Sequence, residues 1–147
     1  MDSKIQKQMA KMVDAVQPHC DEQITAAMTC SHAGSMGATL LSKLLDGAGA
    51  PITAYNLSGP LFLAVGAKTI YAFKYKPRGF KFKIKKEVAR WPREGASVKA
   101  HETSMMCTFV LELGSGEQYR LEVPIMMGGK ELVHMFLDAI GNVTYSQ

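Results

Sequence analysis

Basic side chains alternate with apolar ones between residues 68 and 90 of this 147-residue chain, a spacing that could place several cations on one surface. Side chains on a β-strand point to opposite faces with a period of two, so the pattern predicts two strands with a basic face each. Like charges opposite one another are unfavourable. This face is therefore either a solvated surface that protects a sheet edge or an anion-binding site. The candidate anion-binding residues are Lys74, Lys76, Arg78, Lys81, Lys83 and Lys85.

Aromatic and aliphatic side chains occupy the alternate positions of the same two strands and are expected to face the core. The segment 76–79, Lys-Pro-Arg-Gly, has the composition of a type I turn. A loop with an even number of residues, two or four, keeps the aromatic side chains on one face. The expected cross-strand pairs are Tyr75 with Phe80, Phe73 with Phe82 and Tyr71 with Ile84.

Metal and nucleophile chemistry have little support in the sequence. His19 adjoins Cys20, and Cys30 lies two residues before His32, but neither pair has the further ligands of a zinc site. No cysteine has a base placed beside it by sequence, and the glycine-rich stretches lack a P-loop or dinucleotide motif. We therefore expect no enzymatic activity, no metal and no cofactor.

The basic residues are concentrated in one region. Residues 68–99 contain eleven Lys and Arg against Glu87 and Glu94, a net charge of +9, whereas the remainder carries −5, which together give the overall +4. The chain is thus a mildly acidic body with one basic region. Three cysteines without framework spacing predict reduced, buried thiols, and neither a signal peptide nor a membrane span is evident. We expect a cytoplasmic location.

Two amphipathic helices are predicted. One covers residues 3–16, with Ser3 as its N-cap and apolar residues at three- and four-residue steps. The other lies near the C-terminus and is followed by Gly141, which can adopt the left-handed conformation that ends a helix. Residues 143–147 are expected to form a tail. The apolar stripe of the second helix consists of Leu132, Val133, Phe136, Leu137 and Ile140.

Short runs of alternating apolar residues predict several more strands. On the strand at 23–31, the side chains of Ile24, Ala26, Met28 and Cys30 are expected to share one face. Glycines at 114 and 116 predict a hairpin between the last two strands, and residues 93–95 are expected to be a loop. The additional strands are predicted at residues 60–65, 97–102, 105–113 and 117–123.

Residues 33–51 form an insert rich in glycine and alanine that is expected to be flexible. Within it, residues 36–46 are compatible with a short leucine-rich helix. Such a helix could cap one end of a barrel, act as a lid or touch a membrane; its single cation, Lys43, gives little support to membrane contact.

These elements predict an α+β fold in a single domain spanning residues 1–147. After the N-terminal helix, residues 20–141 are expected to form a strongly bent antiparallel sheet or partly open barrel of about seven strands. The C-terminal amphipathic helix is expected to cap the open side of this barrel.

This order of elements resembles that of bacterial pleckstrin-homology-like proteins of unknown role. The resemblance covers residues 20–141 and is carried by QITAAMTCS, LFLAVGAKTIYAFKYK and the Trp91-Pro92 step. It implies a binding or assembly module without a cofactor. Eukaryotic pleckstrin-homology domains that bind phosphoinositides use basic residues around their first hairpin. Lys76-Pro77-Arg78 and Lys81-Phe82-Lys83 are similar in charge, although the second ends in lysine, which cannot make the bidentate contact of arginine.

Three functions from different classes follow from these observations. The first is a protein-binding or assembly module, including a homo-oligomer. The second is binding of anionic lipid headgroups or phosphorylated ligands through the basic hairpin 74–85. The third is nucleic-acid binding, which is disfavoured because the aromatic side chains alternate away from the lysines instead of sharing their face for base stacking.

Overall fold

The computed structural model describes residues 3–32, 60–78, 81–125 and 129–146. Within these ranges it contains two α-helices, a 3-10 turn and eight strands, which confirms the α+β class. The insert at 33–51, with the possible helix at 36–46, lies outside the described residues. The elements are α1 (Ser3–Val16), η1 (Gln17–His19), β1 (Ile24–His32), β2 (Pro60–Gly66), β3 (Thr69–Arg78), β4 (Lys81–Pro92), β5 (Ser97–Glu102), β6 (Met106–Glu112), β7 (Gln118–Pro124), α3 (Gly129–Ile140) and β8 (Val143–Ser146).

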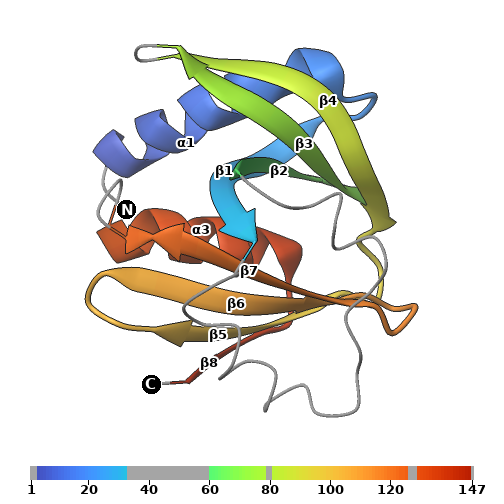
Figure 1. Ribbon diagram of the computed structural model, residues 1–147, viewed down its shortest axis with the longest axis vertical. Coiled ribbons are helices and arrows are strands. Elements are labelled where there is room, and N and C mark those ends of the chain that lie inside the picture. The colour runs from blue at the N-terminus through green and yellow to red at the C-terminus, as the bar shows by residue number, and fades with distance from the viewer. Residues whose placement is uncertain (1–2, 33–59, 79–80, 126–128, 147) are drawn as a thin grey trace.

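The strands form one sheet in the order β4-β3-β2-β1-β7-β6-β5-β8, with β4 and β8 at its two ends. β1 pairs with β2 along most of its length but with β7 only through Ser31 and His32. The sheet bends at this short contact into two halves, β1–β4 and β5–β8 (Figure 1). All neighbouring strands are antiparallel except β5 and β8, which are parallel. The prediction of a tail at 143–147 is therefore wrong, because residues 143–146 add an edge strand to β5.

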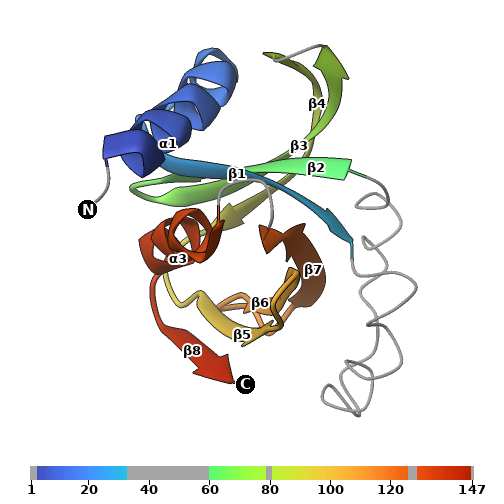
Figure 2. The same cartoon turned by 90° about the vertical axis from the view of Figure 1, so that its left-hand side faces the viewer.

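The larger hydrophobic core lies between the two halves of the sheet and is covered by α3 (Figure 2). The predicted apolar stripe of the C-terminal helix is confirmed, since all five of its members are buried here. Gly141 follows the helix with φ of 98°, as predicted for its C-terminal stop. The packed residues come from both halves of the sheet, including Leu63 of β2 and Phe109 of β6.

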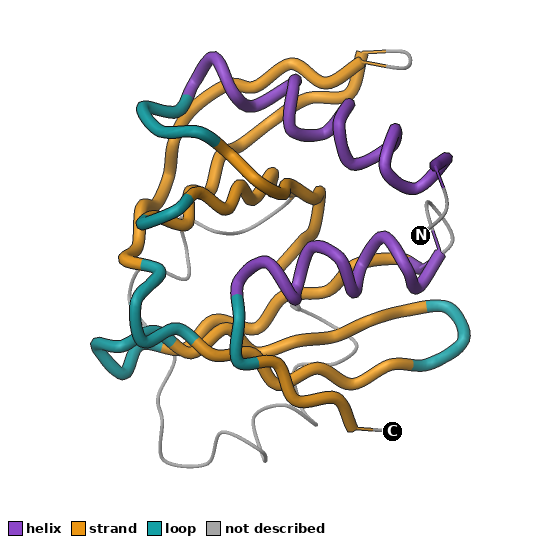
Figure 3. The backbone as a smooth tube through the Cα atoms, turned by 180° about the vertical axis from the view of Figure 1, so that it is seen from behind, coloured by secondary structure: helices purple, strands orange, loops and turns teal. Residues whose placement is uncertain are grey.

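A second core lies on the opposite face of β1–β4, beneath α1. The extent of α1 agrees with the prediction, although Ser3 is its first helical residue. Val16 of α1 packs there with aromatic side chains of β2 and β3, whereas Ile5 and Met9 reach the larger core. Seen from behind, α1 and α3 lie one above the other (Figure 3), and the two helices contact each other.

Because both faces are covered, the first part of β3 is buried completely and not half-buried as predicted. Ile70 and Ala72 pack into the larger core, and Tyr71 and Phe73 pack into the smaller one; all four are at most 2% exposed. The alternation in the sequence did not reveal this arrangement, because Ile70 and Ala72 occupy the positions that were expected to face solvent.

The side chains of β1 differ from the prediction at one residue. Ala26, Met28 and Cys30 share the larger core, but Ile24 packs into the smaller one. The pairing with β2 shifts between Ile24 and Ala26, which leaves Thr25 as an extra residue. Such a bulge reverses the alternation on one side of it.

Candidate anion-binding site

The β3–β4 hairpin holds the predicted basic residues, but in a different register. Tyr75 lies opposite Ile84, and Pro77 lies opposite Phe82. The predicted pairs Tyr75–Phe80, Phe73–Phe82 and Tyr71–Ile84 are therefore wrong, as is a four-residue turn at 76–79. The strands continue to Arg78 and resume at Lys81, so only residues 79 and 80 join them, and these lie outside the described ranges.

Pro77 is accommodated inside β3 because this part of the strand has only one neighbour. β2 pairs with β3 no further than Leu61 opposite Lys74. A proline, which lacks the backbone N–H, is tolerated where no second strand requires that donor. The partner of Tyr75 moves from Phe80 to Ile84, an even number of positions. The inward and outward faces near the tip are consequently the same as predicted.

Six cations lie in directly opposed positions on one face of this hairpin. Lys74 lies opposite Lys86, Lys76 opposite Lys83, and Arg78 opposite Lys81. Neighbouring strands are about 4.8 Å apart, and a two-residue step along a strand covers about 6.7 Å, so the six backbone positions form a compact two-by-three array. The cationic face is defined as Lys74, Lys76, Arg78, Lys81, Lys83 and Lys86.

Lys86 replaces the predicted Lys85 in this array. The pairing shifts between Lys74 and Tyr75, so that Lys85 is an exposed bulge residue without a cross-strand partner. A bulge inserts one extra residue and moves every later side chain to the other face. The adjacent Lys85-Lys86 pair was the only sequence signal for this change, because it interrupts the strict alternation.

The cationic face continues a buried surface outward. Ile70 and Ala72 precede Lys74 at alternate positions of β3 and lie in the larger core. Pairing with β2 ends at Lys74, which is half-buried, and the other five cations beyond it are exposed. In the described part of the chain, no carboxylate forms an ion pair with these five exposed cations. Their mutual repulsion makes the face a favourable place for a polyvalent anion.

The opposite face of the hairpin is packed against the smaller core, which confirms the inward orientation of the aromatic side chains. Phe82 and Tyr75 each make edge-to-face contacts with Phe62 of β2, with ring centroids 5.4 Å and 5.6 Å apart. They also contact each other at 5.6 Å. Burial raises the pKa of Tyr75. This aromatic cluster fixes the hairpin on the sheet, while the cationic face of the hairpin remains exposed.

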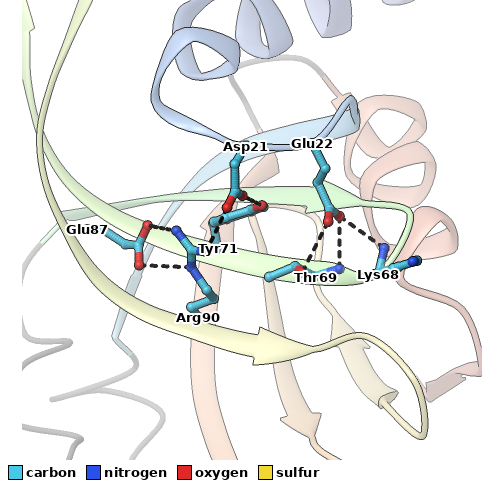
Figure 4. A network of polar contacts seen from close by, with 7 residues as sticks. All are labelled: Asp21, Glu22, Lys68, Thr69, Tyr71, Glu87 and Arg90. Atoms are coloured by element: carbon cyan, nitrogen blue, oxygen red, sulfur yellow. Dashed lines mark hydrogen bonds and ion pairs between the residues drawn. The ribbon is translucent and has the colours of Figure 1, made fainter.

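A network of polar side chains holds the base of the hairpin (Figure 4). The guanidinium of Arg90 donates to Glu87 at 2.9 Å and to Asp21 at 3.1 Å, and its carbon lies 5.0 Å from the centre of the Tyr71 ring. The Tyr71 hydroxyl donates to Asp21. Glu87 therefore neutralises Arg90 and not the neighbouring Lys86.

The protonation states in this network follow from its contacts. Hydrogen bonds from Tyr71 and Arg90 lower the pKa of the Asp21 carboxyl. Burial, together with the bond to Asp21, raises the pKa of Tyr71 to about 12. The carboxylates of Glu87 and Asp21 raise the pKa of Arg90. Asp21 and Arg90 therefore stay charged and Tyr71 stays neutral near pH 7, an arrangement that is structural and leaves the cationic face free of these carboxylates.

Glu22 secures the turn between β2 and β3 beside this network (Figure 4). Its Oε1 atom accepts hydrogen bonds from the backbone N–H groups of Lys68 and Thr69, both at 3.0 Å. Its Oε2 atom accepts from the Thr69 hydroxyl at 3.2 Å. Two sequential acidic residues, Asp21 and Glu22, thus attach the segment before β1 to the start of β3 and to β4.

The three cysteines are not activated as nucleophiles. Cys30 and Cys107 are buried, as predicted, and Cys20 is partly buried. Burial raises the pKa of Cys107 to about 12 and that of Cys20 to about 11, so both are thiols at neutral pH. His134 contacts the Glu102 carboxylate. Among the described residues, no three His, Cys, Asp or Glu side chains are grouped as metal ligands.

None of the helices in the described ranges has the length and apolar character required to cross a bilayer. No protein-family model, curated protein or solved structure matches this chain.

Proposed function

We propose that this chain is a non-enzymatic, pleckstrin-homology-like binding module whose cationic face binds the anionic headgroups of a lipid surface. The single observation that carries the proposal is the array of three opposed cation pairs on an exposed hairpin face. Surface charges attract an anionic membrane when several lie within about a Debye length of it. An array on one face of a hairpin can present its cations to such a surface together.

The pleckstrin-homology-like assignment is supported by the bent antiparallel arrangement of β1–β7 and by the helix α3 that covers the larger core. Reduced thiols are consistent with a cytoplasmic location. Binding of nucleic acid is less well supported, since the aromatic side chains of the hairpin pack against Phe62 on the face opposite to the cations.

The test is co-sedimentation with phosphatidylcholine vesicles prepared with and without phosphatidylglycerol. The wild-type chain should bind only the anionic vesicles, and binding should decrease at high salt because the Debye length falls from about 10 Å at 0.1 M to about 3 Å at 1 M. Reversing the charges of Lys76 and Lys83 with Lys76→Glu and Lys83→Glu together should reduce binding at least tenfold, since each cation contributes about 1 kcal/mol.

A matched control is the double variant Lys99→Glu and Lys130→Glu. It changes the net charge by the same amount at exposed positions outside the hairpin. Its binding should remain close to that of the wild type. Equal losses in both double variants would show that net charge, and not the cationic face, determines binding. No binding to anionic vesicles at low salt would reject the proposal.

Self-association is a second candidate, favoured by the two end strands of the sheet. Bulges at Lys85 and Val88 interrupt the pairing of β4, and such irregularities discourage further strand addition. The edge of β8 is more suitable, and Tyr145 is one of two exposed large hydrophobic side chains among the described residues. Sedimentation velocity of the wild-type chain should then detect a dimer whose population rises with concentration. A monomer at all concentrations would exclude this candidate.

A further inference from the structure

A groove lies between α1, the outer part of the β3–β4 hairpin and the start of α3, elements whose arrangement is visible in Figures 1 and 2. It consists of two adjoining hollows of about 650 Å³ and about 490 Å³. Met12, Phe82 and Leu132 line both hollows, so the two lie side by side. Each volume falls within the range of about 300–1,000 Å³ that is usual for small-molecule sites.

The two hollows differ in the charge of the described residues that line them. No charged residue of the described ranges lines the inner one, whose walls include Met28, Tyr75 and Val133. The outer one is bordered by Lys11 and Asp14 of α1 and by Lys81 of β4. A ligand that fits both hollows has an apolar part inside and a polar part outside. Two lysines against one aspartate favour an anionic polar part.

We infer that this groove binds the alkyl chain of an anionic amphiphile, with the charged head held between Lys11 and Lys81. The inference rests on the proposed function, because Lys81 also belongs to the cationic face and therefore joins the groove to the lipid-binding surface. The module then withdraws one chain from the lipid surface to which the hairpin binds.

Side-chain chemistry supports an alkyl chain as the occupant. Met12 and Met28 have flexible, polarizable side chains that adapt to an irregular apolar ligand. Phe82 and Tyr75 are only half-buried in the folded chain, so a bound alkyl group can cover apolar surface that is otherwise wet. Among the described residues at the mouth, Asp14 is the one unfavourable charge, and Asp14→Asn should strengthen binding of an anion.

The first test uses the wild-type chain and calorimetric titration with monoalkyl phosphates below their micelle concentrations. Ethyl, octyl and decyl phosphate carry the same head. Affinity should rise by about fourfold for each methylene that enters the groove, which corresponds to about 0.8 kcal/mol. Decyltrimethylammonium has the same chain length with a cationic head and should bind at least tenfold more weakly than decyl phosphate.

The second test fills the groove. Met12 is half-buried and lines both hollows, so Met12→Trp should occupy the space and weaken decyl phosphate binding at least tenfold. Met12→Leu has a similar volume and should bind as the wild type does. For the head, Lys11→Glu should weaken binding, whereas Lys7→Glu, an exposed lysine one helical turn away that does not line the groove, should not. Thermal unfolding verifies that each variant is folded.

The outcomes separate this inference from the proposed function. If the chain binds anionic vesicles but binds ethyl and decyl phosphate with equal affinity, the inference about the groove is overturned and the proposed role of the cationic face is unaffected. Chain-length-dependent binding of decyl phosphate without vesicle binding would support the groove and reject the membrane surface. A dimer that Met12→Trp converts to a monomer would show a second copy in the groove and overturn the inference.

Discussion

The hydroxyl group of Tyr71 joins a buried aromatic ring to a charged network at the surface. The residue itself is fully buried, yet its hydroxyl reaches Asp21, whose carboxylate also binds Arg90. A short polar link of this kind fixes the start of β1 relative to β3 and β4. The contribution of the link depends on the protonation state of the hydroxyl, which can be measured.

Replacing Tyr71 with Phe should lower the free energy of unfolding by about 1 kcal/mol near neutral pH, since one hydrogen bond is lost. The pKa of Tyr71 is raised from 10.0 to about 12 in the folded chain. A raised pKa means that the stability contributed by the protonated hydroxyl is complete below pH 10 and is lost as the pH approaches 12. The difference between wild type and Tyr71→Phe in urea unfolding should therefore shrink over that window. A difference that stays constant would contradict this role.

Single residues also explain where sequence reasoning about the site succeeded and failed. Five of the six cations on the face were predicted, because a two-residue period is visible in the sequence. Lys86 was not, because a bulge at Lys85 depends on how two strands pair, and the adjacent Lys85-Lys86 pair was its only sequence signal. The same limitation applies to Thr25, whose bulge places Ile24 in a different core from Ala26.

Among the elements, the β2–β3 turn depends on a contact between Gly66 and Glu22. A Cβ atom on Gly66 would lie 2.0 Å from Glu22 Oε1, so Gly66→Ala must displace the carboxylate from the backbone N–H groups of Lys68 and Thr69. We expect a loss of about 1–3 kcal/mol in unfolding free energy. In a Glu22→Ala background, the same substitution should cost much less. A double-mutant cycle by urea unfolding measures this coupling, and purely additive losses would contradict it.

The edge strand β8 is held by side chains from α3. The Tyr145 ring lies 4.4 Å from that of His134, and its hydroxyl donates to Asp138 at 3.1 Å. Tyr145→Ala should therefore release β8 and cost about 1–2 kcal/mol, with faster amide hydrogen exchange in β5. Thr144→Ala is the matched control on the same strand and should leave exchange unchanged. Equal protection of β5 in both variants would argue against this anchoring.

The sequence predicted elements with strong periodicity better than elements defined by distant pairing. The boundaries of α1 and the stripe of α3 agree with the structure because apolar residues repeat along each helix. β8 was missed because four alternating residues are too few to identify a strand, and they form one only through parallel pairing with β5. The hairpin turn was misplaced because Pro77 occurs inside a strand where only one neighbour pairs with it.

At the scale of the whole molecule, the half-sheet β1–β4 separates two cores; α3 and the N-terminal half of α1 cover the larger one, and α1 covers the smaller one. Removal of residues 1–16 should expose Phe62, Tyr71 and Phe73 together, which creates a large apolar patch. The shortened chain should bind a hydrophobic dye and lose cooperative thermal unfolding. Retention of the wild-type transition would show that α1 is dispensable for the fold.

The charge of the whole chain is divided unevenly between two regions. The basic region of +9 lies between residues 68 and 99, and its cationic face projects on one hairpin, while the rest of the chain carries −5. An anionic surface attracts the basic region and repels the acidic remainder, so it orients the molecule before contact.

The alternation of side chains along the two hairpin arms also determines how this hairpin can vary in length. Beyond Lys74 the arms pair only with each other, so their reach is independent of the rest of the sheet. Two residues added to both arms would extend the hairpin by about 7 Å and preserve which side chains meet the ligand. One residue added to a single arm would invert every side chain beyond it. Engineered versions with longer reach should therefore be built in steps of two.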